Sequence, residues 1–321
     1  MTAVIMSRIL KANKQRIRGA PMIKSTSSPF SLAVSDAPLA IGPSGWHYPH
    51  WDGAIYPRQR PRGFHPLEFL SQRFDAVEIA ASFENDIRPE LALLWMAKVQ
   101  ANPRFQFTAR LHRRFTHERQ LDAADVDSFN VGLRELKRGK RLGAVLMQFP
   151  WSFRFTKENR DYFIELRRAF HEFPLVAEMR HESWMSSEAV GTLIDYRVGF
   201  CNLDQPEHVR AMPPTAFLTS PIAYFRLHGR QRAWWWNEYQ QATKPQNGSH
   251  RGYAYSPAEL NDWKGRVEQV RGIAEQSFCF FTNDGGGQSV VNAMQFSSMC
   301  ERPAKRAAMN EMDQMLELAV A

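Results

Sequence analysis

The segment VAEMRHESW, residues 176–184, begins like a buried strand and continues into ionisable side chains. Strand side chains alternate between two faces, so Glu178 and Arg180 should point in the same direction. The same spacing places Arg226 and His228, in the segment AYFRLHG, on one face of another strand. If both pairs point inward, a carboxylate, two guanidinium groups and an imidazole share one site.

These residue types are suited to acid–base chemistry. Glu78, Glu178 and His228 are the candidate catalytic residues, because carboxylates and imidazoles are common general acids and bases. A hydrolase or an isomerase could use them. An internal salt-bridge network would need the same residues, because a buried charge is costly unless it is paired. For any one residue the two interpretations are equally good, whereas polar residues at the ends of all the strands together favour a ligand site.

Three arginines among these residues indicate an anionic ligand. The planar guanidinium groups of Arg110, Arg180 and Arg226 match pairs of phosphate or carboxylate oxygens. The segment NDGGGQSVVNA, residues 283–293, could also expose backbone N–H groups to an anion, although a simple glycine turn would have the same sequence. We therefore expect a phosphorylated or nucleotide-like substrate. The other candidate substrate-binding residues are Ser44, Trp46, His117, Gln148, His181, Asp204, Asn283 and Asp284.

A divalent metal ion is a second interpretation of the same carboxylates. Carboxylate oxygens and imidazole nitrogens are common metal ligands. The spacing fits no compact metal motif such as HExxH, so no residue is assigned to a metal and the cofactor is left unknown. The residues that could bind such an ion are Glu78 and Glu178 together with His117, His181, His228, Asp204 or Asp284.

The elements that must position these residues alternate regularly from Leu39 onward. Eight short apolar segments alternate with amphipathic segments of helix length, several of which open with Ser, Asp or Pro in cap-like positions. This alternation predicts parallel strands joined by right-handed crossovers, and eight such units close into a (β/α)8 TIM barrel of the α/β class. The predicted strands are 39–42, 76–80, 105–111, 143–149, 175–181, 198–204, 223–229 and 278–284, and the predicted helices include 88–99, 127–139, 157–170, 186–197 and 256–276.

An open doubly wound sheet is the alternative to the barrel. The barrel is favoured because nearly every predicted strand has a polar residue at its carboxyl end, and a barrel brings all these ends to one face. An open sheet would spread them along a wide edge. The repeat is expected to be irregular around the sixth and seventh units, since residues 205–221 contain four prolines and no convincing helix.

The chain is expected to have three parts, with the barrel at residues 39–300. Residues 1–40 hold six basic side chains against Asp36 alone, which gives +5 of the total charge of +8 and leaves +3 for the other 281 residues. The basic part, residues 1–38, is predicted to be a disordered extension, with a transit peptide or a nucleic-acid-binding arm as alternatives. Residues 301–321 are predicted to form a C-terminal helix that packs on the barrel or on another subunit.

Composition narrows the environment of the protein. No run of about 18 apolar residues is present, so no membrane-spanning helix is expected. The three cysteines are odd in number and two lie in apolar segments, which suits a reducing cytoplasm better than a disulfide framework. Trp234, Trp235 and Trp236 lie in the segment 232–241, and at least one should face solvent in a lid or a partner surface. The oligomeric state is left open.

Several segments, in this order along the chain, resemble the DUF72 family, also called YecE-like: IGPSGWHYPHW, FDAVEIAASF, FTH at 115–117, GAVLMQFP, AEMRHESW, FRLHGR, YAYS and FTND. The resemblance covers about residues 41–296. It implies a TIM barrel with a polar pocket at the carboxyl ends of the strands and no established reaction. The pocket residues that it implies are Ser44, Gly45, Trp46, Glu78, His117, Gln148, Glu178, Arg180, His181, Trp184, Asp204, Arg226, His228, Asn283 and Asp284.

Departures from the family pattern bear on the chemistry. Relatives usually read VEIN where this chain reads VEIA, so Ala80 replaces an asparagine, and Glu84 replaces an aromatic residue. Arg110 replaces a lysine that is common on the third strand. An arginine stays protonated, so a reaction that used this lysine as a base or a nucleophile would be lost here.

Two functions agree with these observations. The first is an enzyme that hydrolyses or isomerises an anionic substrate, with Glu178 as acid or base; a nuclease-like version rests on analogy of fold alone. The second is a non-catalytic protein that binds a small anion or a nucleotide and engages a partner through the aromatic segment 232–241. In either case nucleic acid could bind to the basic N-terminal arm.

Overall fold

The computed structural model describes residues 38–231 and 252–300, in which eight strands pair in parallel. Their order in the sheet is β1-β8-β7-β6-β5-β4-β3-β2, so each strand lies beside its neighbours in the chain. The strands are β1 (Leu39–Pro43), β2 (Ala76–Ile79), β3 (Gln106–Arg110), β4 (Leu142–Gln148), β5 (Leu175–Glu178), β6 (Gly199–Asp204), β7 (Ile222–Leu227) and β8 (Gln276–Phe281).

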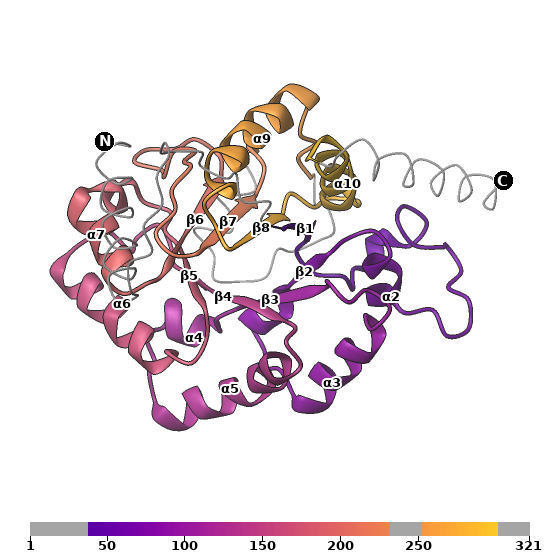
Figure 1. Ribbon diagram of the computed structural model, residues 1–321, viewed down its shortest axis with the longest axis horizontal. Coiled ribbons are helices and arrows are strands. Elements are labelled where there is room, and N and C mark those ends of the chain that lie inside the picture. Colours follow the sequence, from indigo (N-terminus) through magenta and orange to yellow (C-terminus); the bar gives the residue numbers. More distant parts are fainter. Residues whose placement is uncertain (1–37, 232–251, 301–321) are drawn as a thin grey trace, which may run out of the picture. The chain divides into compact units, whose positions relative to one another are not determined.

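The ring closes where β1 meets β2. Ser44 and Glu78 form a parallel bridge, and the Gly45 amide donates to the Glu78 carbonyl oxygen at 2.8 Å. A Cβ on Gly42 would lie 1.8 Å from the carbonyl oxygen of Ala76, so only glycine permits this approach of the two backbones. The sheet is therefore a (β/α)8 barrel, as the alternation in the sequence predicts (Figure 1).

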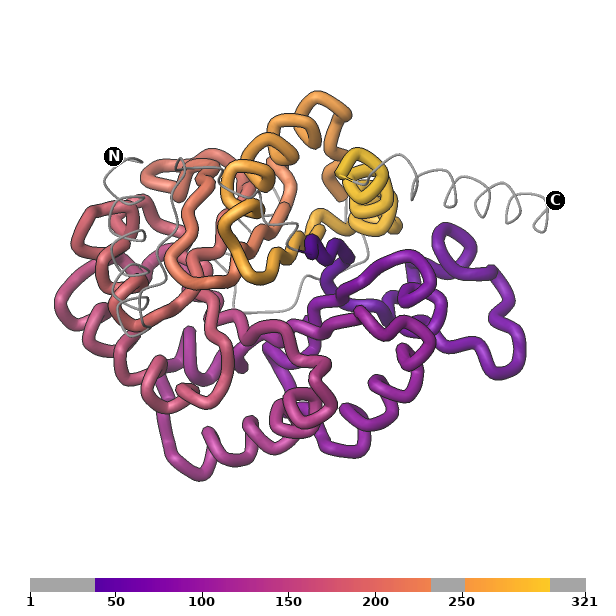
Figure 2. Tube along the Cα trace, in the orientation of Figure 1, coloured from indigo at the N-terminus to yellow at the C-terminus, as the bar shows by residue number. Residues whose placement is uncertain are grey.

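Helices follow the strands and cover the outside of the ring (Figure 1). In Figure 2 the first strand, in indigo, lies beside the last helix, in yellow, with which it is in contact. The α-helices are α2 (Pro66–Ser71), α3 (Pro89–Lys98), α4 (Arg113–Thr116), α5 (Ala123–Arg138), α6 (Lys157–Ala169), α7 (Ser187–Asp195), α9 (Pro257–Arg271) and α10 (Gln288–Cys300), and the short 3-10 helices are η1 (Pro49–Trp51), η2 (Ala80–Phe83) and η3 (Glu182–Met185).

The helices form where the sequence predicts them, although α5 begins four residues before the predicted 127–139 and α9 ends five residues before the end of the predicted 256–276. α5 buries Phe129, Leu133 and Leu136 at the spacing of one helix face, and each such side chain contributes roughly 1.5–3 kcal/mol to folding. The hydroxyl of Ser256 accepts from the Glu259 amide while the Glu259 carboxylate accepts from the Ser256 amide, which forms a capping box at the start of α9.

The link between β6 and β7 contains no helix over residues 205–221, as its prolines predict. The side chain of Asn202 holds this link instead. Its Nδ2 donates to the Phe217 carbonyl oxygen at 3.0 Å, and its Oδ1 accepts from the Phe217 amide at 2.7 Å and from the Thr215 hydroxyl at 2.8 Å. Backbone groups that a helix would have paired are thus satisfied by one buried amide.

The strands separate two hydrophobic cores. The larger core lies between the strands and the helices, and the smaller core fills the barrel interior. The ring of Phe278 lies so close to Gly143 that a Cβ there would be 2.4 Å from it, so the interior is filled by side chains and is not a channel. The interior residues are Ala40, Ala76, Ala144, Leu146, Val176, Cys201, Tyr224, Phe278 and Phe280.

Several strands end earlier than predicted. β5 ends at Glu178 instead of residue 181, and β8 ends at Phe281 instead of residue 284. The apolar pattern is misleading here because Met179 remains buried after β5 has ended, and the chain then pairs through His181 with Ala211 in an antiparallel bridge. Arg180, Asn283 and Asp284 therefore lie in loops that follow the strands, whereas Glu178 is still part of β5.

Three predicted segments lie outside the described residues. They are the basic extension 1–38, apart from its last residue, the aromatic segment 232–241 and the C-terminal helix 301–321. In the part of the chain that the structure describes, none of the helices has the length and the apolar character needed to cross a membrane.

Replacement of Gly42 by alanine should open the barrel seam and destabilise the protein by roughly 3 kcal/mol, because the new methyl group overlaps a backbone carbonyl. Gly265 is the matched control: it lies in α9 with no atom within 4 Å of an added Cβ, so Gly265→Ala should stabilise the helix by about 1 kcal/mol. Urea unfolding curves measure both changes. Equal midpoints for the two variants would contradict the proposed closure.

Candidate functional site

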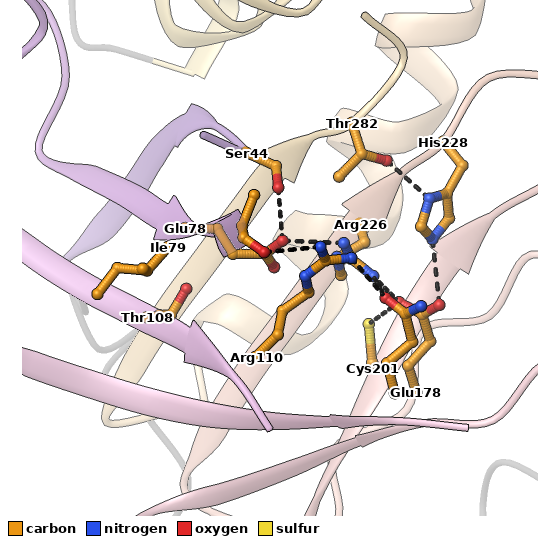
Figure 3. Close-up of polar contacts among 12 residues, drawn as sticks. Ser44, Glu78, Ile79, Thr108, Arg110, Glu178, Cys201, Arg226, His228 and Thr282 are labelled. Carbon is orange, nitrogen blue, oxygen red and sulfur yellow. Dashed lines mark hydrogen bonds and ion pairs between the residues drawn. The ribbon is translucent and has the colours of Figure 1, made fainter. Parts of the chain in front are cut away.

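A layer of polar side chains lies directly above the apolar interior of the barrel. Glu78 stands two residues after Ala76, Gln148 after Leu146, Glu178 after Val176 and Arg226 after Tyr224. Side chains two residues apart on a strand lie on the same face. The four polar side chains therefore point inward, like the apolar residues that fill the interior. All four polar side chains are buried, and Figure 3 shows Glu78, Glu178 and Arg226 pointing toward one another.

Arg226 is the centre of this layer. Its Nη2 donates to Glu78 Oε1 at 2.9 Å, its Nη1 donates to Gln148 Oε1 at 2.8 Å, and Nη1 also pairs with Glu178 Oε2. The Arg226 side chain is 2% exposed and both carboxylates are 0% exposed, so these charges interact with little screening by solvent. One guanidinium from β7 therefore joins side chains of β2, β4 and β5 (Figure 3).

Glu78 is also held by two hydroxyl groups. The Ser44 hydroxyl donates to its Oε1 at 2.6 Å and the Tyr224 hydroxyl donates to its Oε2 at 3.1 Å. The Tyr224 hydroxyl in turn lies 2.9 Å from the Thr108 hydroxyl, which can donate to it. Burial, together with the charge of Glu78, raises the pKa of Tyr224 well above its usual value, so this phenol stays neutral and keeps its donor.

Glu178 lies between two guanidinium groups and an imidazole. Arg180 Nε donates to its Oε1 at 2.9 Å, and His228 Nε2 lies 3.3 Å from the same oxygen. Burial by itself would raise the pKa of Glu178, but the charges of Arg226 and Arg180, together with the contact from His228, outweigh burial and lower the pKa well below its usual value. Glu178 is therefore an ionised carboxylate at neutral pH and acts on its neighbours through charge.

His228 connects Glu178 to the last strand. Its Nδ1 lies 2.7 Å from the Thr282 hydroxyl, on the opposite side of the ring from Glu178 (Figure 3). Burial lowers the pKa of His228, and the attraction of Glu178 only partly offsets that effect. A neutral imidazole with one nitrogen toward a carboxylate and the other toward a hydroxyl is the resulting arrangement.

The edge of the site is formed by Arg110, Phe83 and His117. Arg110 donates through Nη2 to the Ala80 carbonyl oxygen at 2.8 Å and through Nη1 to Gln148 Oε1 at 3.3 Å, and its guanidinium lies 4.5 Å from the Phe83 ring centroid. The His117 ring meets the same phenyl ring edge to face at 5.1 Å. Burial, followed by the charges of nearby arginines, lowers the pKa of His117 to about 4.

Two residues predicted for the site lie elsewhere. Trp46 packs edge to face on Trp95 of α3, with ring centroids 5.0 Å apart, and belongs to the outer core. His181 accepts from the Ser183 amide at 3.1 Å and so caps η3. Both side chains point away from the central layer, because the chain turns at Gly45 before Trp46 and because His181 has the opposite strand phase to Arg180.

Asp204 and Asn283 are buried but hold loops instead of joining Arg226. Asp204 accepts from the Tyr255 hydroxyl at 2.7 Å and from Arg230 Nε at 3.0 Å. Asn283 Nδ2 donates to the Tyr253 carbonyl oxygen at 2.6 Å. Each follows an interior residue of its strand by an odd number of positions, so each faces the outer loops.

Asp284 stabilises the glycine-rich turn that the sequence offers as an anion site. Its Oδ1 accepts from the Gly287 amide at 3.0 Å, and its Oδ2 pairs with His50 Nε2 at 2.6 Å and with Trp51 Nε1 at 2.9 Å. A carboxylate of the protein thus accepts from one backbone amide of this turn, and its negative charge would repel an external phosphate there. The structure favours the simple turn over a phosphate loop at this position.

Four residues of the central layer were not among the candidates. They are Thr108, Cys201, Tyr224 and Thr282, whose polar atoms contact Glu78, Glu178 or His228 directly or through one neighbour. The two-residue period of the strands could have identified two of them. Tyr224 lies two residues before Arg226 and Thr282 lies two residues after Phe280, so both are on the inward face of their strands. Among the described residues, no group of three or more His, Cys, Asp and Glu side chains is placed to hold a metal ion.

Removal of the Arg226 guanidinium should lower the free energy of unfolding. Arg226→Met leaves two buried carboxylates side by side, and we expect a loss of about 3–5 kcal/mol in the free energy of unfolding. Arg138, which is 72% exposed and paired with Glu135 on α5, is the control, and Arg138→Met should cost less than about 1 kcal/mol. Urea unfolding compares the two. A small loss for Arg226→Met would show that the carboxylates do not depend on this cation.

The state of Glu178 can be tested by pH. A folded pKa below the usual value of 4.5 means that this carboxylate stabilises the protein above about pH 4.5, and that the contribution is lost as the pH falls toward its folded pKa. The stability difference between the wild type and Glu178→Gln should therefore be constant from pH 5.5 to 7, on the order of several kcal/mol, and shrink below pH 4.5. A difference that grows on acidification would mean that Glu178 is protonated in the folded state.

Comparisons with known proteins agree with this fold. The model of the family described as "Protein of unknown function DUF72" matches residues 40–315. The UPF0759 protein YunF of Bacillus subtilis (strain 168) is 26% identical over 292 residues, which are 86% of this chain and 99% of that protein. A DUF72 family protein from Thermotoga maritima MSB8 superimposes with a TM-score of 0.68 at 28% identity over 82% of this chain and 99% of that one.

A DUF72 family protein from Enterococcus faecalis V583 has the same fold, with a TM-score of 0.63 at 23% identity over 73% of this chain and 92% of that one. The resemblance inferred from the segments around Glu78, Glu178 and Arg226 is thereby confirmed. This chain belongs to the DUF72 family of proteins of unknown function.

Proposed function

We propose that this protein is an enzyme that binds a small anionic substrate at the mouth of the barrel, between Arg110 and Arg180. These two side chains lie on β3 and just beyond β5, on either side of Gln148 at the end of β4. Both are partly exposed, in contrast to Arg226 below them. A ligand from solvent would therefore meet these two guanidinium groups first.

The balance of charge supports an anion. Glu78 and Glu178 contribute two negative charges, and Arg226 between them contributes one positive charge. Arg110 and Arg180 add two more positive charges, so the group has one excess positive charge when His228 is neutral. An anion bound at this edge would balance it, and the low dielectric of the partly buried site would strengthen the attraction.

The arginines that lie around His117 are the observation that carries this proposal. Burial lowers the pKa of His117 first, and the charges of Arg180, Arg113 and Arg110 lower it further, to about 4. Burial alone would not indicate the sign of the potential, but three guanidinium groups near one imidazole make the potential at this edge of the barrel positive. The same potential that repels a proton from His117 attracts a phosphate or a carboxylate.

The carboxylates have a supporting role in this proposal. An ionised, fully buried Glu178 is poorly suited to donate a proton, and its charge instead holds Arg180 and His228 in place. Glu78 likewise holds Arg226. His228, as a neutral base beside a carboxylate, is the better candidate for proton transfer within the set Glu78, Glu178 and His228.

Two departures from the family pattern meet in space. Arg110 Nη2 donates to the backbone oxygen of Ala80, so the arginine that replaces the usual lysine rests on the residue that replaces the usual asparagine. The guanidinium is permanently charged and fixed by this contact and by Gln148. Arg110 is therefore suited to hold an anion, and not to accept a proton.

A non-catalytic anion-binding protein is the second candidate. It is favoured by the pairing of the buried charges, since Glu78, Glu178 and Arg226 satisfy one another without a ligand. Both candidates require the anion site, and only the enzyme requires a reacting group beside it.

Inorganic phosphate should stabilise the wild-type protein, by about 2.7 kcal/mol at a concentration 100 times its Kd. Arg110→Met and Arg180→Met should lose this stabilisation, Arg110→Lys should keep part of it, and Arg138→Met should keep all of it, because Arg138 lies on the exposed face of α5. Thermal unfolding with increasing phosphate at constant ionic strength measures the effect. Equal stabilisation of the wild type and Arg180→Met would exclude the proposed position.

The same titration has a second readout in the NMR signal of His117, assigned by comparison with His117→Gln. Bound phosphate should raise the pKa of His117 from about 4, because an anion stabilises the imidazolium. Arg180→Met should raise it without phosphate. A pKa that phosphate leaves unchanged, in a protein that phosphate stabilises, would place the anion elsewhere.

A further inference from the structure

Glu178, His228 and Thr282 lie at the ends of β5, β7 and β8 and contact one another in series. Thr282 Oγ1 lies 2.7 Å from His228 Nδ1, and His228 Nε2 lies 3.3 Å from Glu178 Oε1 (Figure 3). A hydroxyl within hydrogen-bond reach of an imidazole, which is in turn oriented by a carboxylate, is the general arrangement of an activated nucleophile.

The contacts of His228 determine which of its nitrogens carries a hydrogen and which can accept the proton of Thr282. The Glu178 carboxylate favours a hydrogen on His228 Nε2, so Nδ1 keeps its lone pair and can accept the Thr282 proton. The Thr282 oxygen also lies 3.2 Å from the Leu227 carbonyl oxygen, but its contact with Nδ1 is shorter by half an ångström. Burial lowers the pKa of His228, which keeps the imidazole in the neutral form that a base requires.

Other hydroxyl and imidazole contacts in the described residues differ in origin. The Thr116 hydroxyl contacts His117, and the Ser183 hydroxyl contacts His181, in each case within two residues along the chain. Such contacts are common local features of turns and caps. Thr282 and His228 are 54 residues apart and come from neighbouring strand ends, so the fold itself brings this pair together.

The exposure of the three side chains also differs. Glu178 and His228 are buried, whereas Thr282 is partly exposed and lies one residue beyond β8. Thr282 has the inward phase of Phe278 and Phe280 and therefore points toward the mouth of the barrel. The reactive atom is thus at the boundary with solvent, and the groups that activate it are below it.

From this geometry we propose that Thr282 is a nucleophile, with His228 as its base and Glu178 as the residue that positions His228, and that the protein cleaves an ester of an anionic substrate. This inference rests on the proposed anion site at Arg110 and Arg180, which would supply the binding of the substrate charge. In the Ser-His-Asp triad the carboxylate faces Nδ1, whereas here it faces Nε2 and the hydroxyl faces Nδ1.

The reaction balances without another reagent except water. Thr282 Oγ1 gives its proton to His228 Nδ1 and bonds to the ester carbonyl carbon, whose double-bond electrons move to its oxygen. When these electrons return, the bond to the alcohol oxygen breaks, and the alcohol leaves with the proton from Nδ1. Water then attacks the Thr282 ester by the same route, which returns the proton to Thr282 Oγ1 and releases the acid.

The test uses the full-length protein and mono-4-nitrophenyl glutarate, an activated ester that carries a carboxylate. We expect a burst of 4-nitrophenolate equal to the protein concentration, a mass increase of one glutaryl group, and its location on Thr282 by peptide mapping. Thr282→Val should abolish the burst, Thr282→Ser should retain it, and His228→Gln should slow it roughly 100-fold or more. Thr192→Val, which removes a hydroxyl from the outer helix α7, is the matched control and should leave it unchanged.

Other outcomes would overturn the inference. These are a burst that survives in Thr282→Val, a glutaryl group on another residue, or no acylation of a wild-type protein that phosphate still stabilises. Neutral 4-nitrophenyl butyrate separates this inference from the anion site. Acylation of Thr282 by both esters at equal rates, together with no stabilisation by phosphate, would keep the nucleophile and remove the proposed anion site.

Discussion

The pairing of one guanidinium with two carboxylates is the interaction on which the site depends. Arg226 contacts Glu78 and Glu178 where solvent is nearly absent, so loss of any partner leaves a charge that water cannot stabilise. Replacement of such a set by apolar residues of similar volume often costs a protein no stability. The fold alone therefore gives little reason for these charges. Their use is better sought in the side chains that they hold, the partly exposed Arg180 and the buried His228, which contacts the partly exposed Thr282.

Barrel closure and the site share residues. The seam between β1 and β2 is made by the bridge of Ser44 with Glu78, and the Ser44 hydroxyl also donates to the Glu78 carboxylate. Gly42 brings the two backbones close enough for both contacts. Any change that opens the seam must also move Glu78, and Arg226 would carry that movement to Glu178. The contacts that close the barrel between β1 and β2 therefore also fix the positions of the charged side chains in the site.

The fold could be predicted from the sequence, whereas the residues that form the site could be predicted only in part. Alternating apolar segments gave all eight strands, because strand and helix periods are local. Glu78, Gln148, Glu178 and Arg226 were found because each is a polar residue in an apolar strand. His181, Asp204 and Asn283 are also polar residues in or just after apolar strands, yet they face outward. The choice between faces depends on which residues fill the interior, and that is set by packing between distant strands.

The face of the strand on which a residue lies also explains why the sequence points to Asn283 and not to Thr282 as a site residue. In FTND the two residues are adjacent, and the amide is the more conspicuous polar group. Phe278 and Phe280 occupy the interior, so the inward face of β8 continues to Thr282, and Asn283 turns to the loop of Tyr253. A residue at the end of an inward face is buried enough to be held and exposed enough to meet a ligand. Arg110, Arg180 and Thr282 share this position, while the carboxylates that orient their neighbours lie one layer deeper.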